Sequence, residues 1–249
     1  MSKSDITAQM VVKNEDIFIR YSITSILPYI DKLLIADTGS TDETLQTISS
    51  IKSEKIEIDQ IKSNNKIDIG SIRQQQLTKT QTDWIWIIDG DEIYPGSLGK
   101  EITRMIKAKG SGLEGIIVQR FDLLGDIYHY QSDEAGFYDL FGRKGHFALR
   151  LINKKIIPGL HIEGNYPNEG YYDKDGIELI HHNPEKYVFT DGNLWHAMYL
   201  QRSTLGKNLS NTLHRNKYKI ETGLHIPDTS ALPEVFFKFN PGSTKDIRQ

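Results

Sequence analysis

The chain has 249 residues, of which 38% are hydrophobic and 25% charged, and its formal net charge is −3. This composition is typical of a folded globular protein and excludes an intrinsically disordered chain and a strongly basic, nucleic-acid-binding one. There are no cysteines, so disulfides and thiolate metal sites are excluded as well.

No apolar run approaches the roughly 20 residues that a membrane-spanning helix needs. The first five residues also lack the basic and apolar regions of a signal peptide. We therefore expect a cytoplasmic protein without a transmembrane segment, for which peripheral contact with a membrane stays open.

Short apolar runs alternate with amphipathic stretches up to Pro95. Ser40 and Glu43 have the spacing of a capping box, which predicts a helix start at that turn. The alternation indicates an α/β fold with a mostly parallel central sheet and helices on both faces. The predicted strands are 6–12, 32–36, 56–61 and 84–88, and the predicted helices are 15–27, the stretch ending near 51, and 69–79.

The strand at 84–88 is apolar on both faces, since Trp84, Trp86 and Ile88 point one way and Ile85 and Ile87 the other. A central parallel strand has this pattern. The strand runs directly into an acidic segment, and ligands of open α/β sheets bind just beyond the carboxyl ends of the strands. We therefore expect chemistry at this segment.

After Pro95 the pattern is less regular. Trp195 and His196 fall in a predicted C-terminal helix and are expected to pack over the core. The elements predicted here are a helix at 98–109, strands at 115–121, 147–152 and 177–180, a long loop at 122–145, an irregular stretch at 159–176, a helix at 194–213, and a Pro/Gly-punctuated tail from 227.

Two acidic turns follow apolar strands, one at Asp37 and one at Asp89 and Asp91. Carboxylates that cluster at strand ends repel one another unless a positive group shares the site. Mg²⁺ or Mn²⁺ prefers such oxygen ligands together with substrate phosphates, and Gly90 lets a ligand approach closely. A solvated turn or helix start is the simpler alternative, and a calcium loop would need further ligands that are absent.

Seven segments, in order, carry a resemblance to a known family: MVVKNED, LIADTGSTDETL, GSIRQQQL, DWIWIIDGDE, ALRLINKK, GLHIEG and LIHHNPEKY. Over roughly residues 6–187 the sequence resembles the family 2 glycosyltransferases of the GT-A fold. It is most similar to the subgroup with a DTGSTD turn, which includes lipopolysaccharide-core and bacteriocin glycosyltransferases. The resemblance implies a nucleotide-sugar-binding half at 1–95 and an acceptor-binding half with a C-terminal helix and tail at 96–249, in what we expect to be one continuous domain.

The resemblance also implies a donor site and a metal site, with Mn²⁺ or Mg²⁺ as the cofactor. A UDP-linked hexose or N-acetylhexosamine is the expected donor. The implied donor-binding residues are Val12, Glu15, Asp37, Arg73, Asp89 and Gly90, and the implied metal-binding residues are Asp91, Asp89, His181 and His182. Asp91 is the expected direct ligand, Asp89 its helper, and Glu92 a supporting carboxylate.

The family inverts the anomeric centre in a single displacement, which requires a general base for the acceptor. Glu163 is the expected base, with His161 in the same strand phase. The family's adjacent His-Glu pair is here separated by Ile162, and its Arg-Asn is here Arg73 followed by Gln74. An ion pair is the alternative role for Glu163, and the rival bases are Asp133, Glu134 and Asp139.

Two other functions stay open at this stage. A sugar-phosphate nucleotidyltransferase would also have an α/β nucleotide domain and a carboxylate-bound metal, although it would carry a Gly-rich basic loop where this chain has Asn14-Glu15-Asp16. A non-catalytic nucleotide-sugar-binding module would keep the fold and lose turnover. The acceptor, whether a glycan, a lipid-linked glycan or a peptide, is not identified by the sequence.

Overall fold

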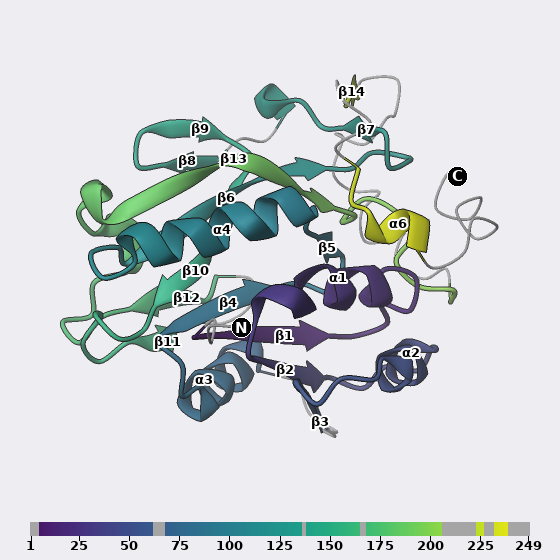
Figure 1. Ribbon diagram of the computed structural model, residues 1–249, viewed down its shortest axis with the longest axis horizontal. Helices are drawn as coiled ribbons and strands as arrows, with labels where there is room; N and C mark the ends of the chain where they lie inside the picture. The colour runs from purple at the N-terminus through teal and green to yellow at the C-terminus, as the bar shows by residue number, and fades with distance from the viewer. Residues whose placement is uncertain are drawn as a thin grey trace.

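The computed structural model describes residues 5–61, 68–135, 138–164, 168–205, 223–226 and 232–238. Its centre is an eight-stranded sheet in the order β3-β2-β1-β4-β10-β6-β13-β5 (Figure 1). One part of the sheet is parallel throughout, and its strands end at a common edge. These strands are β1 (Ile6–Val12), β2 (Lys32–Asp37), β3 (Ile56–Gln60) and β4 (Trp84–Ile88).

The second part of the sheet is mixed. β10 (Phe147–Asn153) runs antiparallel between β4 and β6 (Gly115–Asp122). β13 (Tyr187–His196) pairs in parallel with β6, and β5 (Glu92–Ile93) is antiparallel to β13. Strands from both sides of Pro95 therefore form one sheet.

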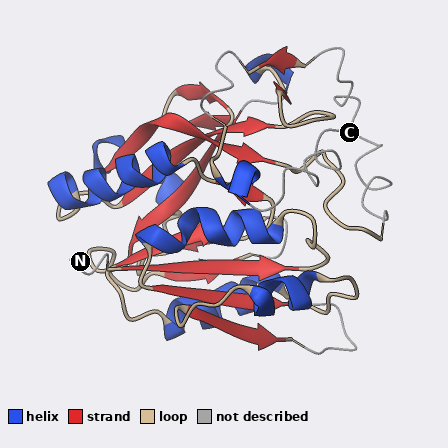
Figure 2. Cartoon of the chain, turned by 45° about the vertical axis from the view of Figure 1, so that its right-hand side comes forward, coloured by secondary structure: helices blue, strands red, loops and turns tan. Residues whose placement is uncertain are grey.

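Helices cover both faces of this sheet. α1 (Ile19–Ile26), α2 (Thr44–Ser50) and α4 (Gly96–Lys109) contribute to the core on the face of Trp84, Trp86 and Ile88. α3 (Ile69–Lys79) covers the other face, where its Leu77 packs with Ile85 and Ile87. Figure 2 shows helices on both sides of the strands. The predicted α/β fold and the two apolar faces of β4 are both confirmed.

Small elements complete the described chain. Two hairpins are formed by β8 (Tyr138–Leu140) with β9 (Arg143–Gly145) and by β11 (His161–Glu163) with β12 (Gly170–Tyr172), and β7 (His129–Tyr130) pairs with β14 (Leu224–His225). The remaining elements are η1 (Leu27–Tyr29), η2 (Asp133–Ala135), η3 (Leu179–His181), η4 (Pro184–Lys186) and α6 (Val235–Lys238). No helix of the described ranges has the length and apolarity needed to cross a bilayer.

Several boundaries differ from the sequence-based expectation near the first two helices. The first helix begins at Ile19 and not at residue 15. The backbone N–H of Glu15 donates to Oγ1 of Thr44 in the neighbouring turn. The second helix is not capped by Ser40, whose hydroxyl binds Asp37. Instead, the carboxylate of Asp42 accepts from the N–H of Thr44.

The second half shows larger differences. Residues 194–196, expected in a helix, extend β13 because they pair with Arg120 to Asp122 of β6; residues 206–213 of that predicted helix lie outside the described residues. The expected strand at 177–180 is replaced by the short helix η3. The expected loop at 122–145 and irregular stretch at 159–176 contain the small hairpins, whose strands are too short to show periodicity.

Candidate functional site

The carboxyl ends of β1, β2 and β4 bring four of the expected donor-binding residues together. Val12 pairs with Asp37 in register. A Cβ atom at Gly90 would lie 3.0 Å from Cγ of Glu15 and 3.2 Å from Cγ1 of Val12. Glycine therefore lets the turn after β4 pack against the end of β1.

Asp37 is 2% exposed and holds its own turn. Its Oδ2 atom accepts from the backbone N–H groups of Gly39 and Ser40 at 3.1 and 3.0 Å. Gly39 has a φ of +94°, a conformation that favours glycine. This carboxylate fixes the shape of the DTGSTD turn.

Asp89 lies between two arginines. Its Oδ2 atom is 2.8 Å from Nη2 of Arg150, and its Oδ1 atom is 3.4 Å from Nη2 of Arg73. A β-bulge in β10 occurs at Arg150, and bulges of this kind re-aim a side chain. Burial alone raises the pKa of Asp89, but the charges of Arg150 and then Arg73 outweigh it and hold the pKa well below its usual value. Asp89 is therefore ionised at neutral pH.

Glu92 is completely buried, and its carboxylate pairs with the same Arg150. It also accepts from the N–H of Asp89 at 3.3 Å and from the hydroxyl of Tyr94 at 3.4 Å. Glu92 thus fixes the turn from inside the core.

Asp91 is 1% exposed and faces an imidazole and a guanidinium. Nε2 of His196 lies 3.7 Å from its Oδ1, and Nη1 of Arg202 lies 3.2 Å from its Oδ2. Arg202 also contacts Oε1 of Glu15 at 3.0 Å, whereas the buried Oε2 of Glu15 has no hydrogen-bond partner among the described residues. Burial, and next the charge of Asp91, raise the pKa of Glu15 well above its usual value.

Asp122 is the last residue of β6 and is 1% exposed. It contacts His196 on the side of the ring away from Asp91. Its Oδ1 is 2.9 Å from Nδ1 of His196, and its Oδ2 is 3.0 Å from Nδ1 of His146. Nε of Arg120 lies 3.0 Å from Oδ1. Burial raises the pKa of Asp122, but the hydrogen bonds from His146 and His196 outweigh it and hold the pKa well below its usual value.

The structure does not bring His181 or His182 to this cluster. Nδ1 of His182 lies 2.7 Å from Oε2 of Glu114, the residue before β6. Asp122, which contacts His196, lies at the opposite end of β6. At roughly 3.3 Å per residue, Asp122 is about 26 Å from Glu114. His182 is therefore far from the acidic segment. Among the described residues, the histidine beside the acidic segment is His196, which the sequence-based expectation had placed in a helix.

The expected base and its neighbour lie at the α3 side of the site. Nε2 of His161 is 2.9 Å from Oε1 of Glu163, whose side chain is 56% exposed. The next residue, Gly164, has its carbonyl against Gly70 at the start of α3. The rival bases Asp133, Glu134 and Asp139 are exposed.

A cavity of about 220 Å³ lies between the β11–β12 hairpin, which carries Glu163, and the two arginines that contact Asp89. Its lining includes Arg73, Arg150, Glu169 and Tyr171. Nε of Arg73 is 3.6 Å from Oε1 of Glu169. Four residues of this region are not expected at the site from the sequence: Glu169, Arg150, Arg202 and Asp122. Of these four residues, only Arg150 stands out in the sequence, because it is the one charged residue in the largely apolar run Phe147–Asn153.

The sheet order, the helices on both faces and the acidic segment after β4 define a GT-A fold. A model of the family described as "Glycosyl transferase family 2" matches residues 7–161. The chain therefore belongs to this family.

Comparison with curated proteins found no match. Similar solved structures include glucosyl-3-phosphoglycerate synthase from Mycobacterium tuberculosis in complex with Mn²⁺, UDP and phosphoglyceric acid, at 24% identity, with 47% of this chain and 42% of that chain covered and a TM-score of 0.35. S. aureus TarS 1–349 is similar at 12% identity, with 60% and 47% covered and a TM-score of 0.44. The chain spans less than half the length of either structure.

Proposed function

We propose that the protein is an inverting glycosyltransferase that takes its sugar from a nucleotide-diphosphate donor and uses Mn²⁺ or Mg²⁺. The observation that carries this proposal is a buried carboxylate, Asp91, facing an imidazole at 3.7 Å and an arginine at 3.2 Å. In this structure Arg202 balances the buried charge of Asp91. In a family 2 glycosyltransferase, a metal ion that carries the donor diphosphate would take over this role.

The residues present fit such an ion. Oxygen and imidazole nitrogen donors suit Mn²⁺, and the ligand atoms of Asp89, Glu92 and His196 lie within 4.8 Å of one another. Because Glu92 is already held by Arg150 and Tyr94, we assign the direct contacts to Asp91 and His196, with Asp89 in support. When bound, the ion supplies Lewis-acid stabilisation of the departing diphosphate.

The chain's own residues would hold the rest of the donor. Val12 and Asp37 wall the place of the base, which the family resemblance suggests is uracil. The unpartnered Oε2 of Glu15 is available to accept from a ribose hydroxyl. Arg73 and Arg202 carry the positive charge that would face the diphosphate, and charge-assisted contacts of this kind are strong.

For the base, we propose Glu163. Its carboxylate would take the proton of the acceptor hydroxyl, while His161 at 2.9 Å would orient it. Replacing Glu163 by Gln should lower kcat by roughly 10²- to 10⁴-fold and leave donor binding unchanged. The matched control is Glu134→Gln, an exposed rival carboxylate; equal losses in both variants would reject Glu163 as the base.

The donor and metal assignment is tested by isothermal titration with UDP and Mn²⁺. We expect binding that a chelator weakens and that Asp91→Asn nearly abolishes, with the exposed Asp139→Asn as the matched control. UDP binding that is unaffected by chelator and by Asp91→Asn would overturn the metal-assisted mechanism. Binding without donor hydrolysis or transfer to any glycan, lipid-linked glycan or peptide acceptor would favour a non-catalytic module.

A further inference from the structure

The imidazole of His196 is held from behind by a single carboxylate. Asp122 accepts from Nδ1 at 2.9 Å, and both side chains are buried. Their positions are fixed by the sheet, because His196 and Asp122 are register partners in the parallel pair of β13 and β6. The ring therefore has one nitrogen committed to the protein interior and the other directed at Asp91.

We infer that Asp122 is a positioning residue that sets the tautomer of His196. A carboxylate accepts only, so Nδ1 of His196 carries the hydrogen. The neutral ring then has its lone pair on Nε2, the atom 3.7 Å from Asp91. Carboxylates that hold metal-binding histidines in this way fix both the tautomer and the ring orientation. The inference rests on the proposed metal role of His196.

Asp122 is itself immobilised. Nδ1 of His146 lies 3.0 Å from its Oδ2, and Nε of Arg120 lies 3.0 Å from its Oδ1. Nε2 of His146 lies 3.1 Å from the carbonyl oxygen of Ser132, which ties the cluster to the loop after β7. Two groups besides His196, an imidazole and a guanidinium, thus contact this carboxylate, so its orientation does not depend on the metal.

The test variant is Asp122→Asn, which keeps the shape and introduces an amide that can donate to Nδ1. That donation moves the ring hydrogen to Nε2 and blocks the metal position. In the presence of UDP, we expect Mn²⁺ affinity measured by electron paramagnetic resonance to fall about 10- to 100-fold, while UDP binding without metal stays unchanged.

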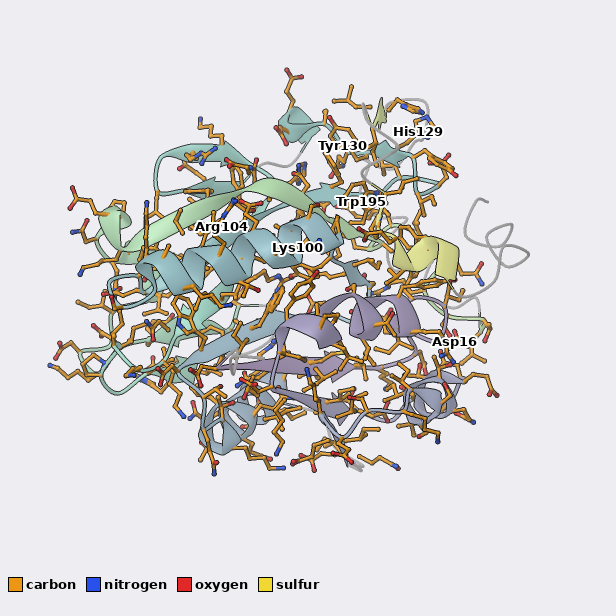
Figure 3. The ribbon with its side chains drawn as sticks, in the orientation of Figure 1. Asp16, Lys100, Arg104, His129, Tyr130 and Trp195 are labelled. Carbon is orange, nitrogen blue, oxygen red and sulfur yellow. The ribbon has the colours of Figure 1, made fainter. Side chains whose placement is uncertain are left out.

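The chain offers a matched control, because Asp126 holds Nδ1 of His129 at 2.8 Å in a second Asp–His pair of the same segment. His129 is labelled in Figure 3. Asp126→Asn makes the same chemical change away from the acidic segment and should keep wild-type Mn²⁺ affinity. An equal loss in both variants would overturn the inference.

Nitrogen NMR of isotopically labelled histidine gives a readout that needs no metal and no variant. At a pH where the ring is neutral, wild-type His196 should carry its hydrogen on Nδ1. A hydrogen on Nε2 in the wild type, or native Mn²⁺ affinity in Asp122→Asn, would overturn the role of Asp122. If the wild type binds no Mn²⁺ at all, the proposed function fails instead, and the tautomer measurement still decides the structural claim.

Discussion

Among the single residues of the site, the four acidic side chains of positions 15, 89, 91 and 92 differ by their cationic neighbours. Glu92 and Asp89 share Arg150, whereas Asp91 and Glu15 share Arg202. Arg150 lies in a strand of the sheet, while Arg202 lies in the segment after β13. The first pairing therefore lies within the sheet, and the second joins the segment after β13 to the acidic segment.

Replacing Arg150 by Met should strongly destabilise the protein. The change leaves Glu92 buried without its cation, and breaking a buried pair in this way costs about 3–5 kcal/mol. Urea denaturation measures the free energy of unfolding. Lys155→Ala is the control, since its pair with Asp83 has side chains 66% and 41% exposed and should contribute less than about 1 kcal/mol. Equal losses in the two variants would contradict this role of Arg150.

Replacing Arg202 by Met should raise the Mn²⁺ affinity of the nucleotide-free protein several-fold. The guanidinium contacts both Asp91 and Glu15, so its replacement removes the arginine that competes with a metal ion for Asp91. Titration followed by electron paramagnetic resonance measures the affinity. Arg104→Met, on the exposed face of α4 (Figure 3), is the control; an unchanged or lower affinity in Arg202→Met would show that the arginine does not compete.

His146 should make stability depend on pH on the alkaline side. Burial lowers its pKa, but the hydrogen bond to Asp122 and the charge of Asp122 outweigh this and raise the pKa above the usual value. The bound proton therefore stabilises the fold fully below about pH 6.5, the unfolded value. The stability is lost as the pH rises through the folded pKa, by at most about 1.4 kcal/mol per pH unit.

His146→Gln should remove this contribution and flatten the fall of the unfolding free energy above about pH 6.5. Urea denaturation of the metal-free protein at several pH values is the measurement. Part of the slope that remains should come from His196, whose pKa is also raised overall although burial lowers it, because the charge of Asp91 is close. Another part should come from His161, whose pKa is raised by its hydrogen bond to Glu163. A variant with the full wild-type slope would exclude His146 as its source.

At the scale of elements, the contact between α4 and η1 depends on one glycine. A Cβ atom at Gly99 would lie 2.2 Å from the ring of Tyr29, whose hydroxyl donates to the carbonyl of Gly96 at 3.0 Å. Gly99→Ala should therefore cost about 1–3 kcal/mol through overpacking. Thermal denaturation can compare it with Gly112→Ala, where the nearest atom is 3.8 Å away. A loss no larger than that of the control would mean that η1 moves freely.

The elements also show where local sequence is a poor guide. Residues 194–196 were expected in a helix, but their pairing with β6 holds them in a strand. This pairing is what places His196 beside Asp91. A strand partner more than 70 residues away in the chain leaves no trace in local periodicity. Local pattern therefore points to His181 and His182 and not to His196.

At the scale of the whole molecule, the two halves divided at residue 95 share one sheet. β4 of the first half pairs with β10 of the second, and β5 pairs with β13. Residues 202–204 also return to the first half, where the N–H of Thr204 donates to Asp16 at 2.9 Å. Figure 3 labels Asp16 near the end of β1. These contacts favour a single cooperative unit.

We therefore expect one unfolding transition. Trp195→Phe leaves Trp84 and Trp86 of the first half as the tryptophan reporters, since the chain has three tryptophans. In this variant, the urea transition followed by fluorescence should coincide with that followed by far-ultraviolet circular dichroism. Two separated transitions would show that the halves unfold independently.

The sequence by itself determined the parallel strands, the two apolar faces of β4 and the acidic segment at its end. Each of these depends on local periodicity and on the rule that ligands bind at the carboxyl ends of strands. It also indicated the family, which the matching family model confirms over residues 7–161.

Only the tertiary structure decided which cations and which histidine face those carboxylates. Arg150 reaches Asp89 through a bulge, Arg202 reaches Asp91 from a segment that follows β13, and His196 arrives through the pairing of β13 with β6. These contacts join residues 61, 111 and 105 positions apart in the chain, distances set by sheet order and not by local pattern. The sequence therefore located the acidic segment, and the fold selected its partners.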